Sequence, residues 1–377
     1  MIRTLLGPSD VRLAACTART WREGAAYEAL PAALRGVALL ADRGGAHVAV
    51  SDGNRTATLI GPTVRFADRD WHVAIKGVGA TANLYGATPV DDVFGHELGT
   101  EDGLLPRTMV TGESWMGESP YGAQGEESAR HGLRVTALGG ADASIGGARI
   151  APIAAVMEIP EERVRADVYW YRRHRGPVLQ ELRLVPSDVR LFHSDARALG
   201  REPLAVLDAF GVRDVGALDE LIHRYLRSGL AAITIFARSA RPTPDGRIEG
   251  LDYRDAWLDK DALIAPDGTV VLVDLESFDW HPTTHREDVA HRVTKQIDRN
   301  LYELLYGLDA LLDVRDRWRE RATDVKARRA ETIARVGLAV VGDEHVRALE
   351  RDDGLDLEIR VASLEDAPSV RVRLLDG

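Results

Sequence analysis

Cysteine and lysine are scarce in this sequence. Cys16 is the only cysteine among 377 residues, so the chain forms neither an internal disulfide nor a thiolate-rich metal site. Only four of the 48 basic residues are lysines, at positions 76, 260, 295 and 326, and the others are arginines. We attribute this bias to the source genome, but it makes each lysine worth examining as a specific cation.

Long apolar segments are missing as well. The first thirty residues carry several charges and no continuous apolar stretch, so we expect neither a signal peptide nor a membrane span. The formal net charge of −11 argues against a general surface for nucleic acids or anionic membranes. The expectation is therefore a cytoplasmic protein with no nucleic-acid or membrane partner.

The remaining composition is that of an ordinary globular protein. Hydrophobic residues make up 45% of the chain and charged residues 28%. The length allows two domains, or one large two-lobed unit, with an ample core. Neither an internal repeat nor a low-complexity tract is visible in the sequence.

The first half of the chain is predicted to be rich in β-structure. Residues 1–45 are rich in alanine and predict one or two short helices with a strand at 37–41. A further strand ends at Lys76, and the Gly- and Pro-rich segment 77–122 predicts a long insertion. One helix is expected at 123–138. Apolar alternation predicts the other strands, at 47–51, 56–60, 64–66, 149–159, 168–171 and 178–185.

The second half is predicted to be mostly helical. A hairpin is expected to turn at Pro266-Asp267-Gly268, and a second hairpin is expected from residue 355 onward. Amphipathic patterns predict helices at 204–210, 217–227 with an extension through 230–236, 285–312 and 315–337.

This order predicts an α+β protein with a two-lobed, protein-kinase-like fold. The N-lobe, residues 1–182, is β-rich with one main helix and contains the insertion at 77–122. The C-lobe, residues 183–340, is mostly helical and contains the first hairpin. Residues 341–377 form a C-terminal extension. A nucleotide would lie between the lobes.

Lys76 is the first residue with a possible chemical role. The segment Val73-Ala74-Ile75-Lys76 matches the Val-Ala-Ile-Lys signature of the third kinase strand, whose lysine contacts phosphate oxygens and a helix carboxylate. The carboxylate would come from Glu127 or its neighbour Glu126. The alternative is a surface lysine and two solvated glutamates.

Asp261 and Asp274 form a candidate metal site. A tight turn between two strands brings their outer ends together, and Asp274 ends the second strand. Carboxylate oxygens are the ligands that Mg²⁺ prefers. The alternative is an ordinary hairpin with solvated acids.

The candidate general base is Asp255 or Asp259. Tyr253-Arg254-Asp255 resembles the His-Arg-Asp of kinases, and Asp259 is closer to Asp261. These acids could equally belong to one solvated acidic loop around Lys260.

Arg183 and Arg190 bracket a Pro-Ser turn. Two arginines in this arrangement can fork onto phosphate oxygens. The alternative is a pair of surface arginines on a linker between lobes.

Two segments in this order resemble the selenoprotein O family of the kinase-like fold. The stretch from Arg183 to Arg190 is similar to that family's Arg-Val-Ala-Pro-Ser-x-x-Arg segment, and Lys76-Gly77-Val78-Gly79 is similar to its Leu-Lys-Gly-Ala-Gly segment. The resemblance extends in patches over residues 70–280. It implies ATP bound in a flipped orientation and AMP transfer to a hydroxyl group of a protein or small-molecule acceptor.

The resemblance also implies roles for individual residues. Lys76 would contact phosphates, Arg183 and Arg190 would hold the outward-facing phosphate, and the metal, Mg²⁺ or Mn²⁺, would lie at Asp261 and Asp274. The family's Asp-Asn pair in the catalytic loop appears here as Lys260-Asp261. Phosphoryl transfer, a catalytically inactive nucleotide-binding protein and a purely structural α+β protein are the alternatives.

Overall fold

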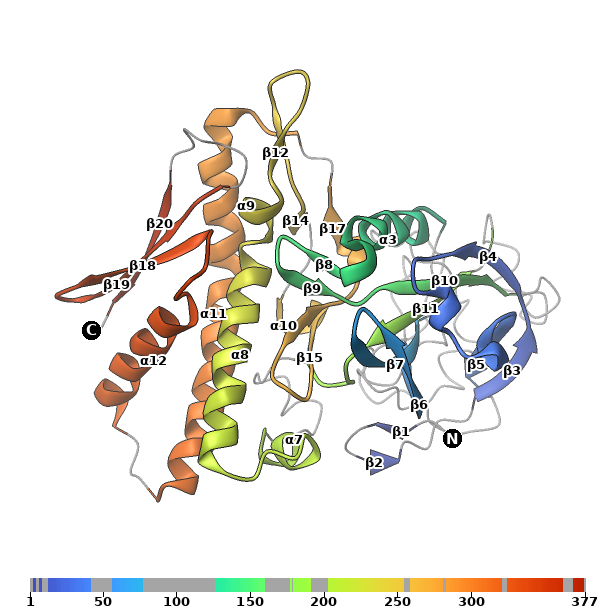
Figure 1. Cartoon of the computed structure of the whole chain (residues 1–377), viewed down its shortest axis with the longest axis horizontal. Helices are drawn as coiled ribbons and strands as arrows, with labels where there is room; N and C mark the ends of the chain where they lie inside the picture. The colour runs from blue at the N-terminus through green and yellow to red at the C-terminus, as the bar shows by residue number, and fades with distance from the viewer. Residues whose placement is uncertain are drawn as a thin grey trace, which may run out of the picture. The chain divides into compact units, whose positions relative to one another are not determined.

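The computed structural model describes most of the chain in defined segments (Figure 1). These segments divide into two compact units. The first unit comprises residues 1–143 and 151–188, and the second comprises 144–150 and 189–377. The described residues are 3–4, 7–8, 13–41, 56–76, 126–159, 177, 179–190, 203–253, 258–280, 283–320, 324–361 and 369–375.

The first unit is built on a five-stranded antiparallel sheet in the order β4-β10-β11-β7-β6. The strands are β4 (Arg19–Glu23), β6 (Thr56–Phe66), β7 (Arg69–Lys76), β10 (Ile153–Glu158) and β11 (Leu179–Val185). Smaller pairs join β1 (Arg3–Thr4) to β2 (Gly7–Pro8) and β3 (Leu13–Thr17) to β5 (Val37–Ala41).

Strand β11 lies in the middle of this sheet. All seven of its residues are buried, because β10 and β7 pair with its two edges and both of its faces are covered.

A short turn at Ala67 and Asp68, both with positive φ, reverses the chain between β6 and β7. Adjacent positive φ values suit the right-handed twist of a hairpin.

One helix, α3 (Glu126–Gly139), packs on this sheet. Ala129 on the helix forms a buried cluster with Ile153, Val156 and Leu179 of β10 and β11. The hydroxyl of Thr136 accepts a hydrogen bond from the backbone N–H of Ile153 at 3.2 Å. The apolar stripe of α3 therefore fixes the helix over the centre of the sheet.

The second unit is dominated by helices. Figure 1 shows α8 and α11 running side by side, with α12 packed against both. The helices are α7 (Pro203–Ala209), α8 (Val215–Ile233), α9 (Ile235–Ser239), α10 (Leu258–Asp261), α11 (Val289–Trp318) and α12 (Val325–Ala339).

Buried polar groups join these helices. The hydroxyl of Tyr225 on α8 donates to the carbonyl of Leu304 on α11 at 3.0 Å. The fully buried Asn300 of α11 accepts from the backbone N–H of Leu258 at 2.9 Å, which satisfies a donor at the start of α10. These contacts fix α10 directly against α11.

Short strands complete the second unit. A four-stranded sheet has the order β15-β16-β9-β8, and β16 pairs in parallel with β9. Its strands are β8 (Ser144–Ile145), β9 (Ala148–Ile150), β15 (Ala262–Ile264) and β16 (Val270–Leu272). The others are β12 (Arg241–Pro242), β13 (Ile248–Glu249), β14 (Asp252–Tyr253), β17 (Phe278–Asp279), β18 (Val346–Arg351), β19 (Gly354–Ile359) and β20 (Val370–Leu375).

Several predictions of local structure were wrong. In residues 13–41 the predicted strand at 37–41 and the short helices are present, the helices as two 3₁₀ turns, but the strands β3 and β4 were not predicted, since cross-strand pairing overrides the helix preference of alanine. The predicted strands at 56–60 and 64–66 are one strand with a register shift. Helix α11 runs through the predicted break at 312–315. The predicted C-terminal hairpin is present as β19 and β20, and β18 extends it to a three-stranded sheet.

The predicted helix at 123–138, the strand at 178–185 and the mixed α+β class are confirmed. The predicted strands at 47–51 and 168–171 and the insertion at 77–122 lie outside the described residues.

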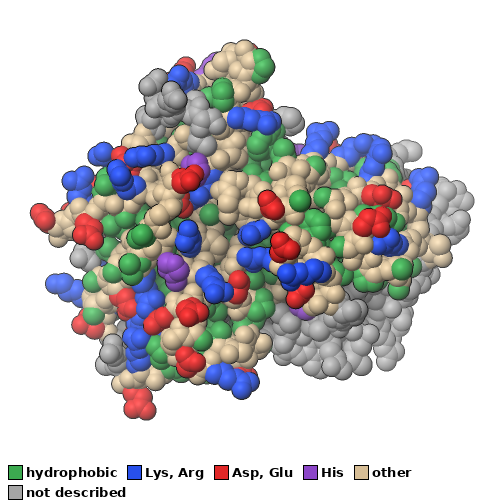
Figure 2. Space-filling view, viewed as in Figure 1, with side chains coloured by type: hydrophobic (Ala, Val, Ile, Leu, Met, Phe, Trp, Pro, Cys, Tyr) green, Lys and Arg blue, Asp and Glu red, His purple; other side chains and the backbone are tan. Residues whose placement is uncertain are grey.

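Basic and acidic side chains are interspersed on the face drawn in Figure 2. Within the described segments, every helix is too short or too polar to cross a lipid bilayer.

Candidate functional site

Lys76 lies at the inner end of β7 and is buried, with 4% of its surface exposed. The register of the sheet places Glu181 of β11 directly opposite it. Opposed residues of an antiparallel pair project from the same face, with Cβ atoms about 5 Å apart. A lysine and a glutamate are therefore brought together on one face in the buried part of the sheet.

Arg183 lies two residues further along β11 and projects from the same face as Glu181. Its guanidinium donates to the carboxylate of Glu181 at 2.6 Å, and both side chains are buried. Lysine, glutamate and arginine are rarely buried unless they are paired. The three residues form a row, which we call the β7–β11 charge row, of two cations and one anion.

Helix α3 covers the face that carries this row. Val156, which α3 contacts, is the register partner of Glu181 on the other side of β11. The first turn of α3 carries Glu126 and Glu127, and both side chains are exposed. Glu126 pairs with Arg130 at 2.5 Å. The proposed pairing of Glu127 with Lys76 stays a prediction.

Glu181 was not singled out from the sequence as a partner of Lys76. The signal was present, because the charged residues Glu181 and Arg183 occupy alternate positions of the strand Leu179–Val185. Such residues share one face of a strand. Only the pairing register of β7 and β11 shows that Lys76 lies opposite Glu181.

The second unit carries the predicted metal ligands. Asp261 is 3% exposed and immediately precedes β15, and its carbonyl accepts from the backbone N–H of Val273 at 2.7 Å. Asp274 is the next residue after Val273. The two aspartates thus lie at the open end of the β15–β16 hairpin, as the turn at Gly268 led us to expect.

Asp274 has an unusual backbone conformation. Its φ and ψ angles of 51° and 50° lie in the left-handed region, and its carbonyl accepts from the N–H of Ser277 at 2.8 Å. This conformation is uncommon for a residue with a Cβ, and it is concentrated at functional sites. It turns the chain sharply at the point where the strand delivers the carboxylate.

The other predicted residues are placed as follows. Arg190 is half-buried and forms a β-bridge with Leu263 of β15. Asp259 belongs to α10, and Asp255 lies outside the described residues. Arg183 belongs to the first unit and Arg190 to the second, so their joint contact with one phosphate stays a prediction.

The metal prediction can be compared with the donors present. Within the described part of the chain, no three His, Cys, Asp or Glu side chains gather into a metal-binding group. Mg²⁺ commonly takes only one or two protein carboxylates when a nucleotide supplies phosphate oxygens. Asp261 and Asp274 fit that donor set by number, ligand type and position on one hairpin.

Comparison with known proteins gives no family assignment. No model of a protein family matches the chain, and no curated protein matches it significantly.

Proposed function

We propose that the chain is an ATP- and Mg²⁺-dependent transferase of protein-kinase-like fold that transfers AMP to a hydroxyl group of its acceptor. The observation that carries this proposal is the β7–β11 charge row. It holds a lysine and an arginine on two neighbouring strands around one carboxylate, and phosphate oxygens are ligands that fixed lysine and arginine side chains bind.

The order of elements along the chain also supports the proposal. An antiparallel sheet with a covering helix precedes a helical unit in which a hairpin ends in Asp274. Lys76 would contact phosphate oxygens, with Glu181 orienting its ammonium group. Asp261 and Asp274 would hold Mg²⁺, which when bound neutralises phosphate charge.

AMP transfer is favoured over phosphoryl transfer by Arg183. Glu181 holds this second cation rigidly beside Lys76, and the resemblance of the segment from Arg183 to Arg190 implies that it contacts an outward-facing phosphate. The acceptor oxygen would attack the α-phosphorus and pyrophosphate would leave. The hydroxyl proton would pass to Asp255 or Asp259.

The test is incubation with Mg²⁺ and ATP labelled at the α- or the γ-phosphate, in the presence of candidate acceptors. We expect the α label on a macromolecule or small acceptor, with release of pyrophosphate. Retention of the γ label instead would identify a kinase. Saturable Mg·ATP binding with no turnover would identify an inactive nucleotide-binding protein.

Binding should be measured first, by calorimetry. Lys76→Ala and Asp274→Ala are expected to weaken Mg·ATP binding at least about tenfold, as for loss of a charged hydrogen bond. Lys326→Ala and Asp298→Ala are matched controls, because both side chains are exposed on helices of the second unit. Equal behaviour of all four variants would contradict the proposed site.

A further inference from the structure

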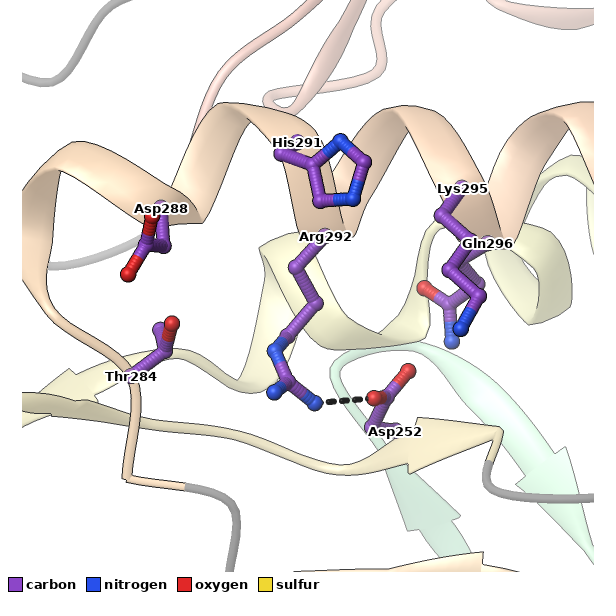
Figure 3. Close-up of a pocket in the computed structure, with 7 residues that line it drawn as sticks. All are labelled: Asp252, Thr284, Asp288, His291, Arg292, Lys295 and Gln296. Atoms are coloured by element: carbon purple, nitrogen blue, oxygen red, sulfur yellow. Dashed lines mark hydrogen bonds and ion pairs between the residues drawn. The ribbon is translucent and has the colours of Figure 1, made fainter.

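A second feature of the helical unit is a pocket of about 340 Å³ beside the first turns of α11 (Figure 3). Its volume lies at the lower end of the range for small-molecule sites. The pocket is lined by Asp252, Thr284, Asp288, His291, Arg292, Lys295 and Gln296. All of these side chains are polar or charged, so the lining offers several hydrogen-bonding groups to a ligand.

An ion pair forms the middle of the pocket. Arg292 donates to the carboxylate of Asp252 on β14, as Figure 3 shows. Its guanidinium also lies 5.6 Å from the ring centroid of Phe236. These two contacts hold the Arg292 side chain in place. Because the charges of Arg292 and Asp252 nearly cancel, the ion pair does not decide whether the pocket prefers an anionic or a cationic ligand.

Gln296 supplies a hydrogen-bond donor that lacks a partner. The side chain is 3% exposed, and its Oε1 accepts from the backbone N–H of Phe236 at 3.1 Å. This bond fixes the amide orientation, because a flipped amide would place two donors against each other. The Nε2 group is buried and has no hydrogen-bond partner among the described residues.

A buried amide donor without a partner costs about 1–3 kcal/mol, so an unfilled donor of this kind points to a ligand or an ordered solvent molecule. Gln296 lines the pocket, and a ligand there can supply the acceptor. The required ligand atom is an oxygen with available lone pairs.

Lys295 places a positive charge beside this donor. It immediately precedes Gln296 on α11, and Figure 3 draws both side chains on the same side of the pocket. The residues that the structure describes provide no ion-pair partner for Lys295 within 4.0 Å. An ammonium next to an amide donor favours an oxyanion.

The acidic residue Asp288 lies at the end of the pocket opposite Lys295. It precedes Lys295 by seven residues, which is about 10 Å along a helix axis. Figure 3 places Asp288 and Thr284 on one side of the Arg292–Asp252 pair and Lys295 on the other. The pocket therefore has Asp288 and Thr284 at one end and the donors Lys295 and Gln296 at the other. The carboxylate of Asp252 that lies near these donors is already paired with Arg292, so an anionic group is best received at the donor end.

We propose that this pocket binds a small molecule through a carboxylate or phosphate group, which accepts hydrogen bonds from Gln296 Nε2 and Lys295 Nζ. The proposal goes beyond the nucleotide site and does not depend on it. Every residue that carries it belongs to the second unit, and its test requires no nucleotide.

The test is calorimetric titration of the full chain with inorganic phosphate and, separately, with acetate, against chloride at the same ionic strength. We expect saturable binding of at least one oxyanion. The stronger of the two identifies whether the ligand presents a phosphate or a carboxylate. Lys295→Gln should weaken binding about tenfold, as expected for loss of a charged hydrogen bond.

Lys326→Gln is the matched control, because it removes one exposed helical lysine elsewhere in the same unit and should leave binding unchanged. Gln296→Glu keeps an oxygen that accepts from the backbone N–H of Phe236 and replaces the Nε2 donor by a second oxygen. We expect this variant to lose oxyanion binding and still to show a cooperative thermal unfolding transition. Absence of saturable binding of both oxyanions to the unmodified chain would overturn the proposal. Equal losses in the two lysine variants would overturn it as well.

Discussion

The two units of this chain use charged residues in different ways. The first unit buries Lys76, Glu181 and Arg183 on the face of a β-sheet. The second unit gathers a larger network where α8, α11 and α12 meet, and most of its members remain partly exposed. This network consists of Asp219, Asp309, Asp313, Arg315, Asp316, Arg319, Arg328, Glu331 and Arg335.

The helical network has a structural explanation. Arg315 donates to Glu331 and to Asp316, while Arg328 reaches Asp309, Asp313 and Asp316. Each arginine thus has several acceptors, and the network ties three helices together. The hydrogen bonds from Arg315 lower the pKa of Glu331 to about 2. Burial favours a raised pKa for Asp316, but bonds from Arg315 and Arg328 lower it overall.

The sheet row differs from this network in its burial, since Lys76, Glu181 and Arg183 are all nearly inaccessible to solvent. A buried ion pair is often no more stable than apolar residues of similar volume. We therefore propose that Lys76 and Arg183 serve a phosphate-bearing ligand, and that the row is not there for stability alone. The two sets of charges differ in burial. The β7–β11 charge row is buried and is our candidate site, whereas the helical network is mostly partly exposed and joins the helices.

The largest effect should follow from breaking the sheet row. Glu181→Ala leaves Arg183 buried without the carboxylate that it contacts, and we expect a loss of about 3–5 kcal/mol in the free energy of unfolding. Denaturation with guanidinium chloride measures it. Glu126→Ala, which removes an exposed i,i+4 pair with Arg130, should cost about 0.5 kcal/mol or less. Similar losses in both variants would contradict the contrast between buried and exposed pairs.

A second prediction concerns the hairpin that carries the predicted metal ligands. Gly268 has a φ of +90°, and a Cβ there would lie 2.5 Å from the carbonyl oxygen of Leu221 on α8. Gly268→Ala should therefore cost about 3 kcal/mol, from strain and from the forced shift of α8. Gly246 has a φ of +80° with open space around it, so Gly246→Ala should cost only about 1 kcal/mol. Thermal unfolding of the two variants compares these losses, and equal losses would show that the contact with α8 is unimportant.

The third prediction tests the helical network by pH. The folded-state pKa of Glu331, about 2, lies below the ordinary 4.5, so its contribution is fully present above pH 4.5. It should be lost as the pH falls from 4.5 toward 2. Because the side chain is partly exposed, we expect Glu331→Gln to cost about 1 kcal/mol near neutral pH.

Urea denaturation at a series of pH values measures the difference between the original chain and Glu331→Gln. The difference should shrink on acidification, whereas the exposed Glu350→Gln should show almost none at any pH. A constant difference across this range would mean that the ionised carboxylate is not what stabilises the helices.

The smallest effect is a gain in stability. Asp274→Gly relieves the left-handed strain at φ 51°, and we expect an increase of about 0.5–1 kcal/mol together with loss of Mg·ATP binding. Asp68→Gly relieves a similar strain at φ 57° in the β6–β7 turn and should retain nucleotide binding. Thermal unfolding and calorimetry measure both properties. Retained binding in Asp274→Gly would remove Asp274 from the proposed metal site.

Much of the local structure could be predicted from the sequence. The apolar alternation of Leu179–Val185 and the helix period of residues 126–138 are local signals, so β11 and α3 were found near their observed limits. The Pro-Asp-Gly turn likewise predicted the hairpin that ends at Asp274. In the alanine-rich start the strand at 37–41 was predicted but its partner β3 was not, because their pairing joins residues twenty or more positions apart.

The candidate site was predictable only in part. Lys76 could be selected because lysine is rare in this chain and ends an apolar strand. Its opposed acid could not, since the sequence offers 59 acidic residues and does not contain the strand register. The pocket beside α11 was not predicted at all, because its lining comes from two segments that only the packing of β14 against α11 brings together.

The sequence by itself therefore determined the element types, the mixed α+β class and the identity of the rare cations, which are all local or compositional properties. The tertiary structure decided which charges are buried and which lie opposite one another. Glu181 faces Lys76 through the register of β7 and β11. The backbone N–H of Phe236 fixes the amide of Gln296, whose Nε2 has no partner among the described residues. Register and burial depend on contacts between distant segments, so no short window of sequence contains them.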